Sequence, residues 1–347
     1  MSFSLPSPPR RMRRREQSHN TIGLTAPKAV STPYNTPFKS RNQSLRCPNV
    51  IDKNTKKAVS QLKDLLNKQW YIFNVSPLFN MDYTEVSLKR YARRLKTKLT
   101  SRLSDSSAVE YEVSYAPYKN LQLNEIDHGA IEVLVEKMTE SGNRSIAYYA
   151  ILLSWGASSE MQPENAVYLP ILICRGLKSI IKQVHTEFQL VHDCFVNSIH
   201  MNAEEMRILS IDIFDSSSYQ EDEIKLRYHL PQNMKSGELD ISLPTFVLSN
   251  LWKRCFSIHK HKEWTDEEVT TFWVEIHNHT YRAFGIELGH CILAKVTLPD
   301  ISFTQEAVYV KKKEHMYLFL SHLMSLCNHL TTVVPFVHEV SLPSSSS

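Results

Sequence analysis

The stretch that decides the fold reads Leu65-Leu66-Asn67-Lys68-Gln69-Trp70-Tyr71-Ile72-Phe73-Asn74-Val75-Ser76-Pro77-Leu78-Phe79. Its middle is a run of aromatic and β-branched residues, which favours an extended strand over about 69–75. A helix is expected just before it, over about 56–68. Ser76-Pro77 ends the strand, because proline lacks the N–H that a sheet needs. We therefore predict a helix that leads directly into a strand.

The composition is that of a protein with a substantial core. The chain has 347 residues, of which 42% are hydrophobic. That length suits one large domain or two ordinary ones. No apolar run reaches the roughly 18–20 residues that a membrane span needs, so no membrane contact is expected. Six cysteines are scattered without a CxxC pair, which opposes a disulfide framework and predicts buried thiols in a reducing compartment.

The N-terminal residues, 1–54, differ in character from the rest and are predicted to be a disordered basic tail. The first 50 residues hold nine Lys or Arg and a single acid, Glu16, although the whole chain has a net charge of only +4. A nuclear import signal is predicted at Arg10, Arg11, Arg13, Arg14 and Arg15. The alternative is a mitochondrial presequence, but the neighbouring prolines oppose the helix that it requires.

Two positions in this tail fit proline-directed kinases. Ser7 and Thr36 each precede a proline and have a basic residue three positions later. Phosphate at either position would lower the local positive charge. At the other end, residues 341–347 are predicted to be a second disordered tail.

Between the tails, helices and strands alternate. Helices are predicted over about 84–103, 176–188 and 202–213. Strands are predicted over about 109–115, 131–137, 146–154, 167–174, 223–229 and 238–243. Several strands follow one another with short polar gaps, which favours antiparallel neighbours. The predicted fold class is therefore α/β (α+β), with a largely antiparallel sheet.

The C-terminal third has the clearest signals. Thr265 and Glu268 form a capping box, and Gly285 ends the helix that the box begins. Strands are then expected over about 287–297 and 303–310. A long helix with an apolar stripe follows over about 312–330, and a short strand is possible over 331–338.

Motifs of known catalytic chemistry are missing from the sequence. The eight glycines form neither GxGxxG nor GxxxxGK[ST], and GxSxG and HExxH are also absent. We therefore expect no cofactor, no bound metal and no small-molecule substrate. The alternative is a nuclear DNA-processing enzyme whose acidic metal site is scattered along the chain.

Two groups of cations suggest contact with a polyanion. In the helix over 84–103, one face is apolar and the opposite face carries Lys89, Arg90, Arg93, Arg94 and Lys96. Such a face can neutralise phosphates without reading bases. The alternative is an ordinary solvated helix face. The second group is Lys311, Lys312 and Lys313, at the start of the last long helix.

These features together resemble a known family. Lys68-Gln69-Trp70, the aromatic strand, Ser76-Pro77-Leu78-Phe79 and a helix bearing Tyr91 are similar to the N-terminal signature of the centromere protein L family. The C-terminal block is similar too, from Glu267-Glu268-Val269 to the Leu-rich last helix. The resemblance covers about 62–100 and 265–330.

The resemblance implies a structural subunit of the constitutive centromere-associated network that is not an enzyme. Such a protein resides in the nucleus, at the centromere and kinetochore. It pairs with centromere protein N, works with other inner-kinetochore subunits, and helps to bind centromeric histone-variant nucleosomes and DNA during chromosome segregation. The implied fold is a curved, largely antiparallel sheet backed by helices. It would span 55–340, with the heterodimer contact in about 265–340.

Within that last region, the two predicted strands can offer an edge to a partner's strand. The alternative is that both lie inside the chain's own sheet. The residues predicted to contact the partner are Ile292, Ala294, Val296, Val308, Val310, Phe319 and Leu323.

Deleting residues 1–50 should leave the melting temperature nearly unchanged, because the tail contributes little apolar surface to a core. It should also reduce nuclear accumulation of a fluorescent fusion, since the five arginines are lost. Replacing only those arginines with Gln is the matched control, and it should reproduce the transport defect. A large fall in melting temperature on deletion would show that the tail packs on the folded domain.

Overall fold

The computed structural model describes residues 53–103, 110–118, 121–138, 142–157, 165–216, 222–231, 237–256 and 265–332. The segment predicted as a helix over 56–68 and a strand over 69–75 is arranged as predicted, except that the helix is divided. It forms α1 (Lys53–Gln61), the short 3-10 helix η1 (Leu62–Leu65) and β1 (Gln69–Val75). The indole N–H of buried Trp70 donates to the carbonyl of Leu65 at 2.7 Å. This bond fixes the angle at which the strand leaves the helix.

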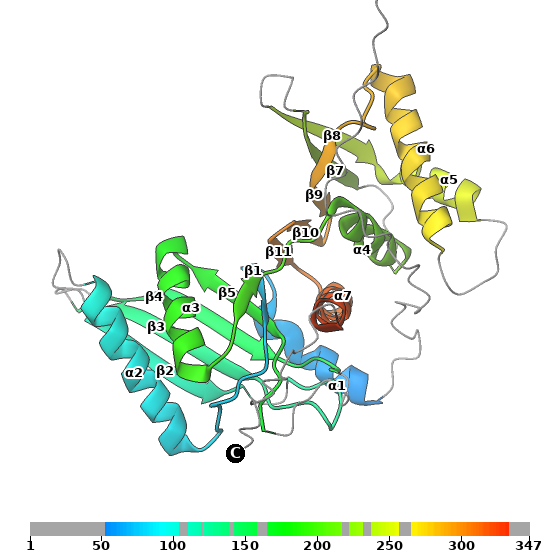
Figure 1. The fold of residues 1–347 in the computed structure, drawn as a ribbon. Helices are drawn as coiled ribbons and strands as arrows, with labels where there is room; N and C mark the ends of the chain where they lie inside the picture. Colours follow the sequence, from blue (N-terminus) through cyan, green and yellow to red (C-terminus); the bar gives the residue numbers. More distant parts are fainter. Residues whose placement is uncertain are drawn as a thin grey trace, which may run out of the picture. The chain divides into compact units, whose positions relative to one another are not determined.

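A single sheet joins the eleven described strands, and every neighbouring pair in it is antiparallel. Strands β1, β11 and β10 connect the part of the sheet that holds β2 to β5 with the part that holds β7 to β9 (Figure 1). The order is β2-β3-β4-β5-β1-β11-β10-β9-β7-β8, and β6 also pairs with β1. The remaining strands are β2 (Glu110–Pro117), β3 (Ile131–Met138), β4 (Arg144–Leu153), β5 (Ile171–Gly176), β6 (Val196–Ser198), β7 (Glu223–His229), β8 (Glu238–Pro244), β9 (Ile292–Leu298), β10 (Ile301–Thr304) and β11 (Ala307–Val310). The α/β class with a largely antiparallel sheet is thus confirmed.

Helices cover both faces of this sheet. They are α2 (Glu85–Leu103), α3 (Lys178–His192), α4 (Ala203–Asp215), α5 (Thr245–Phe256), α6 (Asp266–Phe284) and α7 (Lys313–Thr332). Alternate residues of β1 point to opposite faces. Trp70 and Ile72 enter the core that also receives α1, α4, α5, α6 and α7. Tyr71 and Phe73 pack at the core formed with α2 and α3.

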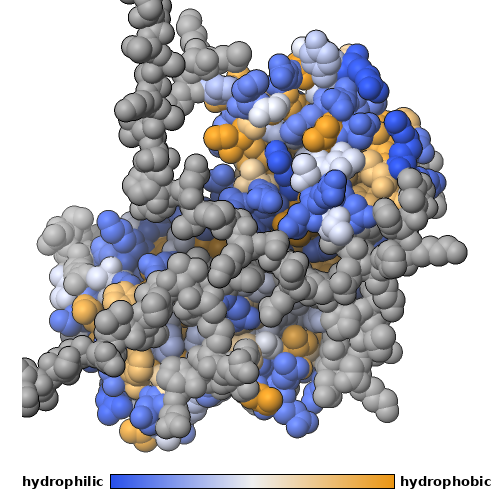
Figure 2. All heavy atoms as spheres, turned by 45° about the vertical axis from the view of Figure 1, so that its right-hand side comes forward, coloured by the Kyte–Doolittle hydropathy of each residue, from blue (hydrophilic) through white to orange (hydrophobic). Residues whose placement is uncertain are grey.

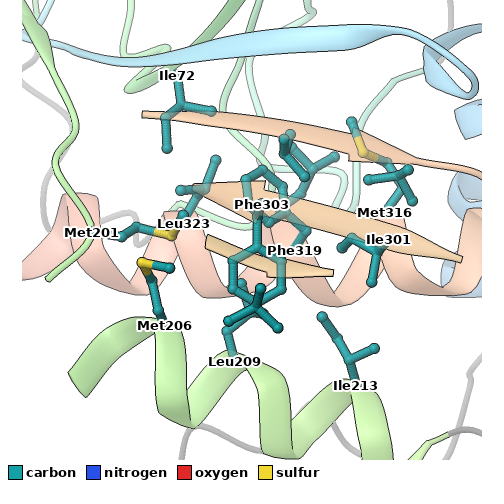
Figure 3. Packing of buried hydrophobic residues seen from close by; sticks show 14 of the residues in the cluster. Ile72, Met201, Met206, Leu209, Ile213, Ile301, Phe303, Met316, Phe319 and Leu323 are labelled. Atoms are coloured by element: carbon teal, nitrogen blue, oxygen red, sulfur yellow. The ribbon is translucent and has the colours of Figure 1, made fainter. Parts of the chain in front are cut away.

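The larger core centres on α7. Phe319 and Leu323 of that helix are fully buried against Phe303 of β10 (Figure 3). Met206 and Leu209 of α4 approach the same cluster (Figure 3). Removing one such side chain typically destabilises a protein by about 2–5 kcal/mol, because a cavity remains. The last helix is therefore a central part of the fold.

The C-terminal elements differ from the prediction in three respects. The strand expected over 287–297 begins at Ile292, since Cys291 N–H closes a turn onto the carbonyl of Leu288 at 3.0 Å. The strand expected over 303–310 is a hairpin of β10 and β11. The Thr304 hydroxyl accepts from the N–H of Ala307 at 3.1 Å and so stabilises the turn.

The third difference lies at the chain's end. The short strand considered over 331–338 begins within α7, which extends to Thr332, and its remainder lies outside the described residues. Two other elements, α5 and β6, were not predicted. The capping box is confirmed: Thr265 N–H donates to the Glu268 carboxylate at 2.8 Å, and Glu268 N–H donates to the Thr265 hydroxyl at 3.2 Å. Gly285 ends α6 with φ of 68°.

One buried histidine lies in an aromatic cage in the core beneath α2 and α3. His192 is fully buried, and its ring centroid is 4.4 Å from that of Phe188 and 4.7 Å from that of Tyr91. Burial lowers the pKa of His192, and likewise that of His185, from 6.5 to about 4.

The stability of the protein should therefore fall on mild acidification. An unfolded chain binds protons at these histidines below pH 6.5, whereas the folded chain keeps them neutral until about pH 4. Stability is thus fully present above pH 6.5 and is lost as the pH falls toward 4, by ~2 kcal/mol per group at pH 5. His192→Phe should flatten this dependence, as measured by urea unfolding at pH 7 and pH 5. The control His229→Gln, at an exposed position, should not. An unchanged pH dependence of stability in His192→Phe would contradict the burial of His192 among these aromatic rings.

Candidate partner and DNA-binding surfaces

The helix α2 begins with a network of short polar side chains. The Asp82 carboxylate accepts from the Thr84 hydroxyl at 2.7 Å, from the Thr84 N–H at 3.1 Å and from the Ser87 hydroxyl at 2.9 Å. These hydrogen bonds lower the pKa of Asp82, and those from Thr84 have the largest effect. They fix the start of the helix, and the buried Leu95 and Leu99 fix its rotation about its axis. Its basic side is thereby directed away from the core.

Two cations on that side already have carboxylate partners. Lys89 Nζ lies 2.6 Å from Glu85 Oε1, one turn earlier in the helix. Lys96 Nζ lies 2.8 Å from Glu110 Oε1 at the start of β2. The sequence shows no acid between the basic residues, but the fold brings Glu110 to them. These two lysines therefore add less net positive charge than predicted.

The three arginines remain cationic. Arg90 lies 5.6 Å from the centroid of the Tyr91 ring and donates to the Ser87 hydroxyl at 3.3 Å. Arg93 and Arg94 are exposed, and among the described residues no carboxylate lies within ion-pair distance of either. We call Arg90, Arg93 and Arg94 the arginine face. It is the part of the predicted basic helix that is available to phosphates.

The second basic run has a structural role. Lys311 Nζ donates to the Pro299 carbonyl at 2.8 Å, and Lys312 Nζ lies 2.6 Å from Asp300 Oδ2. Lys313 Nζ is 3.9 Å from Glu314 Oε1. The contacts of Lys311 and Lys312 thus stabilise the turn between β9 and β10. Their contact with a polyanion stays a prediction.

The residues predicted to contact a partner lie mostly inside the protein. Buried residues of the set are Ala294, Val296, Val308, Val310, Phe319 and Leu323. Ile292 is the exception, with 58% of its surface exposed. The expected free edge is also occupied, because β9 pairs with β7 and β10, and β11 pairs with β1 and β10. The strands are internal, so the edge prediction for 287–297 and 303–310 is wrong.

The open edges of the sheet are β2 and β8, at the two ends of the strand order of the described residues. The helix α2 packs along β2. Among the described strands, none pairs with the outer edge of β8. On the face seen in Figure 2, the hydrophobic residues among those described form small patches between hydrophilic ones. An exposed strand edge is therefore a better candidate for partner contact than an apolar patch on that face.

The other predicted sites are not located by the structure. The import signal predicted at Arg10, Arg11, Arg13, Arg14 and Arg15 lies outside the described residues, as do the predicted phosphorylation positions Ser7 and Thr36. Within the described ranges, no helix is long and apolar enough to cross a membrane. The same ranges contain no group of three or more His, Cys, Asp or Glu side chains suited to a metal ion.

One site was missed at the sequence level. A groove of about 360 Å³ lies between α3 and β1, and its lining includes Lys178, Lys182 and Phe73. The signal in the sequence is weak. It consists of polar residues at helical spacing from Lys178 to Gln189, which is typical of any solvated helix face.

The structure is that of an α/β protein built on one extended antiparallel sheet, with a basic helix and an open strand edge. A profile of the centromere protein L family matches residues 64–327. This region runs from η1 to α7, and it includes every described strand. The chain therefore belongs to the centromere protein L family.

Individual relatives agree with this assignment. Centromere protein L of Xenopus tropicalis is 24% identical over 336 residues, covering 90% of this chain and 93% of that protein. The Mus musculus protein is 23% identical over 253 residues, covering 67% of this chain and 74% of its own length. The Gallus gallus protein is 24% identical, with coverage of 67% and 70%. Family membership makes the chain a centromere and kinetochore protein of the chromosome-segregation apparatus.

Because Val308 and Leu323 are fully or almost fully buried, the double change Val308→Asp with Leu323→Asp tests the core and not an interface. Each unpaired buried carboxylate should destabilise the protein by several kcal/mol, which together approaches the whole stability of a typical domain. We expect no cooperative thermal transition by calorimetry. The matched control is Ile292→Asp at the exposed position, which should shift stability by less than about 0.5 kcal/mol. Wild-type melting of the double variant would contradict the placement of α7.

Proposed function

We propose that this chain is a non-enzymatic structural subunit of the inner kinetochore, and that it pairs with centromere protein N to help hold centromeric nucleosomes. The match to the centromere protein L family over residues 64–327 carries this proposal. Copurification from dividing cells tests it. Recovery of centromere protein N and other inner-kinetochore subunits is expected, and recovery of none of them would overturn it.

The outer edge of β8 is the proposed contact with centromere protein N. Its position supports this, because β8 ends the half of the sheet that contains β9, β10 and β11. An unpaired strand edge offers backbone donors and acceptors to a partner strand. Ile292, exposed at the start of β9, is the residue of the originally predicted set that we propose to touch the partner directly. The six buried members act by holding the strands in place.

The hydrogen-bonding register identifies which backbone groups of β8 face outward. Leu230 N–H donates to the Gly237 carbonyl at 3.1 Å, and Thr245 N–H donates to the Asp222 carbonyl at 2.9 Å. Hydrogen-bonded pairs alternate along an antiparallel ladder. Odd-numbered residues of β8 therefore bond to β7, and the N–H of Ser242 faces the open edge. Pro244 has the same parity, as expected for a proline on an edge strand.

Ser242→Pro should weaken pairing with centromere protein N by tenfold or more, because it removes an outward donor and places a ring on the edge. The pairing of β8 with β7 should survive, since no N–H of that ladder is lost. The control Ser242→Ala keeps the N–H and should pair normally. The measurement is affinity by calorimetric titration, with thermal melting of the free chain as a check. A folded Ser242→Pro chain that binds at wild-type affinity excludes the β8 edge.

The arginine face is the proposed contact with nucleosomal DNA. Support comes from Arg93 and Arg94, which have no carboxylate within ion-pair distance in the described part of the chain, and from the hydrogen-bonded start of α2. Arginines of this kind bind phosphates and position a protein without reading sequence. The five arginines of the N-terminal tail are proposed as the import signal that brings the protein to the nucleus.

Changing Arg90, Arg93 and Arg94 to Glu should weaken DNA binding by the assembled pair to a similar degree on every sequence. The slope of affinity against salt should fall by about one unit per lost phosphate contact. Pairing with centromere protein N should persist, because the apolar face of α2 is unchanged. The matched control changes three exposed lysines on other elements to Glu: Lys57, Lys63 and Lys253. Unchanged affinity and salt slope in the arginine variant would show that this face is only solvated.

A further inference from the structure

A groove on the same sheet face as α3 has the properties of a docking site. We call it the α3 groove. Its volume is about 360 Å³, at the lower end of the range of ~300–1,000 Å³ that is usual for ligand pockets. Its lining residues include Phe73, Lys178, Lys182, Thr186, Val196 and Glu306. They come from β1, from successive turns of α3, from β6 and from the turn between β10 and β11.

The apolar part of the groove is held rigidly. The rings of Phe73 and His185 meet edge to face, with centroids 4.5 Å apart and planes at 85°. His185 Nε2 lies 3.1 Å from the hydroxyl of buried Tyr148. The Gln189 side-chain oxygen accepts from the N–H of Val196 at 2.9 Å, so it joins the two walls. A site with fixed walls binds an apolar side chain without first having to become ordered.

The charges on the two walls are opposite. Lys178 and Lys182 are exposed and lie one turn apart on α3, and in the described ranges neither has a carboxylate within ion-pair distance. The first turn of α3 contains no acidic residue and lacks a side-chain cap, so its positive end is not neutralised. Across the groove, Glu306 Oε1 lies 3.1 Å from His200 Nδ1. An occupant is therefore oriented, with its negative end toward α3.

We propose that the α3 groove binds a short acidic peptide segment of a partner protein. One large apolar side chain of that segment enters the groove over Phe73, Ile181 and Val196, and adjacent carboxylates lie on Lys178 and Lys182. This inference rests on the groove alone and not on the proposed contacts with centromere protein N or DNA.

A nucleic acid fits the same groove less well. A single strand would place a phosphate near each nucleotide, and Glu306 would repel those on its side of the groove. Bases bind by stacking on open ring faces. Phe73 instead makes an edge-to-face contact with His185, and the volume suits one side chain better than a row of bases.

The test is selection of a random dodecapeptide display library on the immobilised full-length chain, followed by fluorescence-anisotropy titration of the selected peptides. Enriched peptides should share an aromatic or large aliphatic residue within about three positions of two acids. Changing Lys178 and Lys182 together to Glu should weaken the binding of the selected peptides by at least tenfold, equivalent to ~1.4 kcal/mol. The matched control, Lys63→Glu with Lys253→Glu, should bind them normally.

A second variant separates shape from charge. Thr186→Phe keeps both lysines but fills the groove from α3, and it should also weaken the selected peptides by at least tenfold. Thermal melting confirms that each variant is folded. The proposal is overturned if no such peptides are enriched, or if folded groove variants bind the selected peptides like wild type. It is also overturned if a labelled twelve-nucleotide oligo-dT binds in a manner that depends on Lys178 and Lys182 while the peptides do not.

Discussion

The position of β1 at the centre of the sheet is the constraint on which the rest of the structure depends. This strand pairs with β5 on one side and with both β6 and β11 on the other. The Trp70 indole N–H of β1 donates to the carbonyl of Leu65, at the end of the preceding helix. The side chains of Trp70 and Ile72 enter the core that also contains α7. Elements from the beginning, the middle and the end of the sequence thus meet along seven residues. A change in β1 would disturb the packing on both faces of the sheet.

This arrangement divides the candidate surfaces according to which face or edge they occupy. The α3 groove lies on the face toward which Tyr71 and Phe73 point, and the arginine face belongs to a helix packed in the same core. The outer edge of β8 is at one end of the strand order, and α7 closes the opposite face. Substitution of exposed residues can therefore alter each surface without disturbing the packing of the core. The buried residues that support a surface are different from the residues that a partner would touch.

The sequence predicts the parts of this fold that depend on local signals. The aromatic run predicts β1, and the capping box predicts the start of α6. The short polar gaps between successive strands predict antiparallel neighbours. What it does not predict depends on contacts between distant residues. The hairpin of β10 and β11 was predicted as one strand because the Thr304 hydroxyl, and no glycine or proline, supports the turn. The salt bridge between Lys96 and Glu110 and the burial of Val308 and Leu323 both follow from tertiary packing. A stripe of apolar residues has the same pattern whether it faces a partner or the protein's own core.

The pairing of β1 with β11 also determines when the chain can fold during synthesis. Residues 69–71 leave the ribosome early, but their partners, residues 307–309, follow 236 to 240 positions later. Until then β1 lacks its neighbour on that side, and the core beneath it lacks α7. At typical elongation rates of ~5–20 residues per second, this interval lasts on the order of 10–50 seconds. A nascent chain of this protein thus exposes apolar surface and one unpaired edge of its central strand for much longer than a protein built from local contacts, and such exposed surface is what chaperones bind.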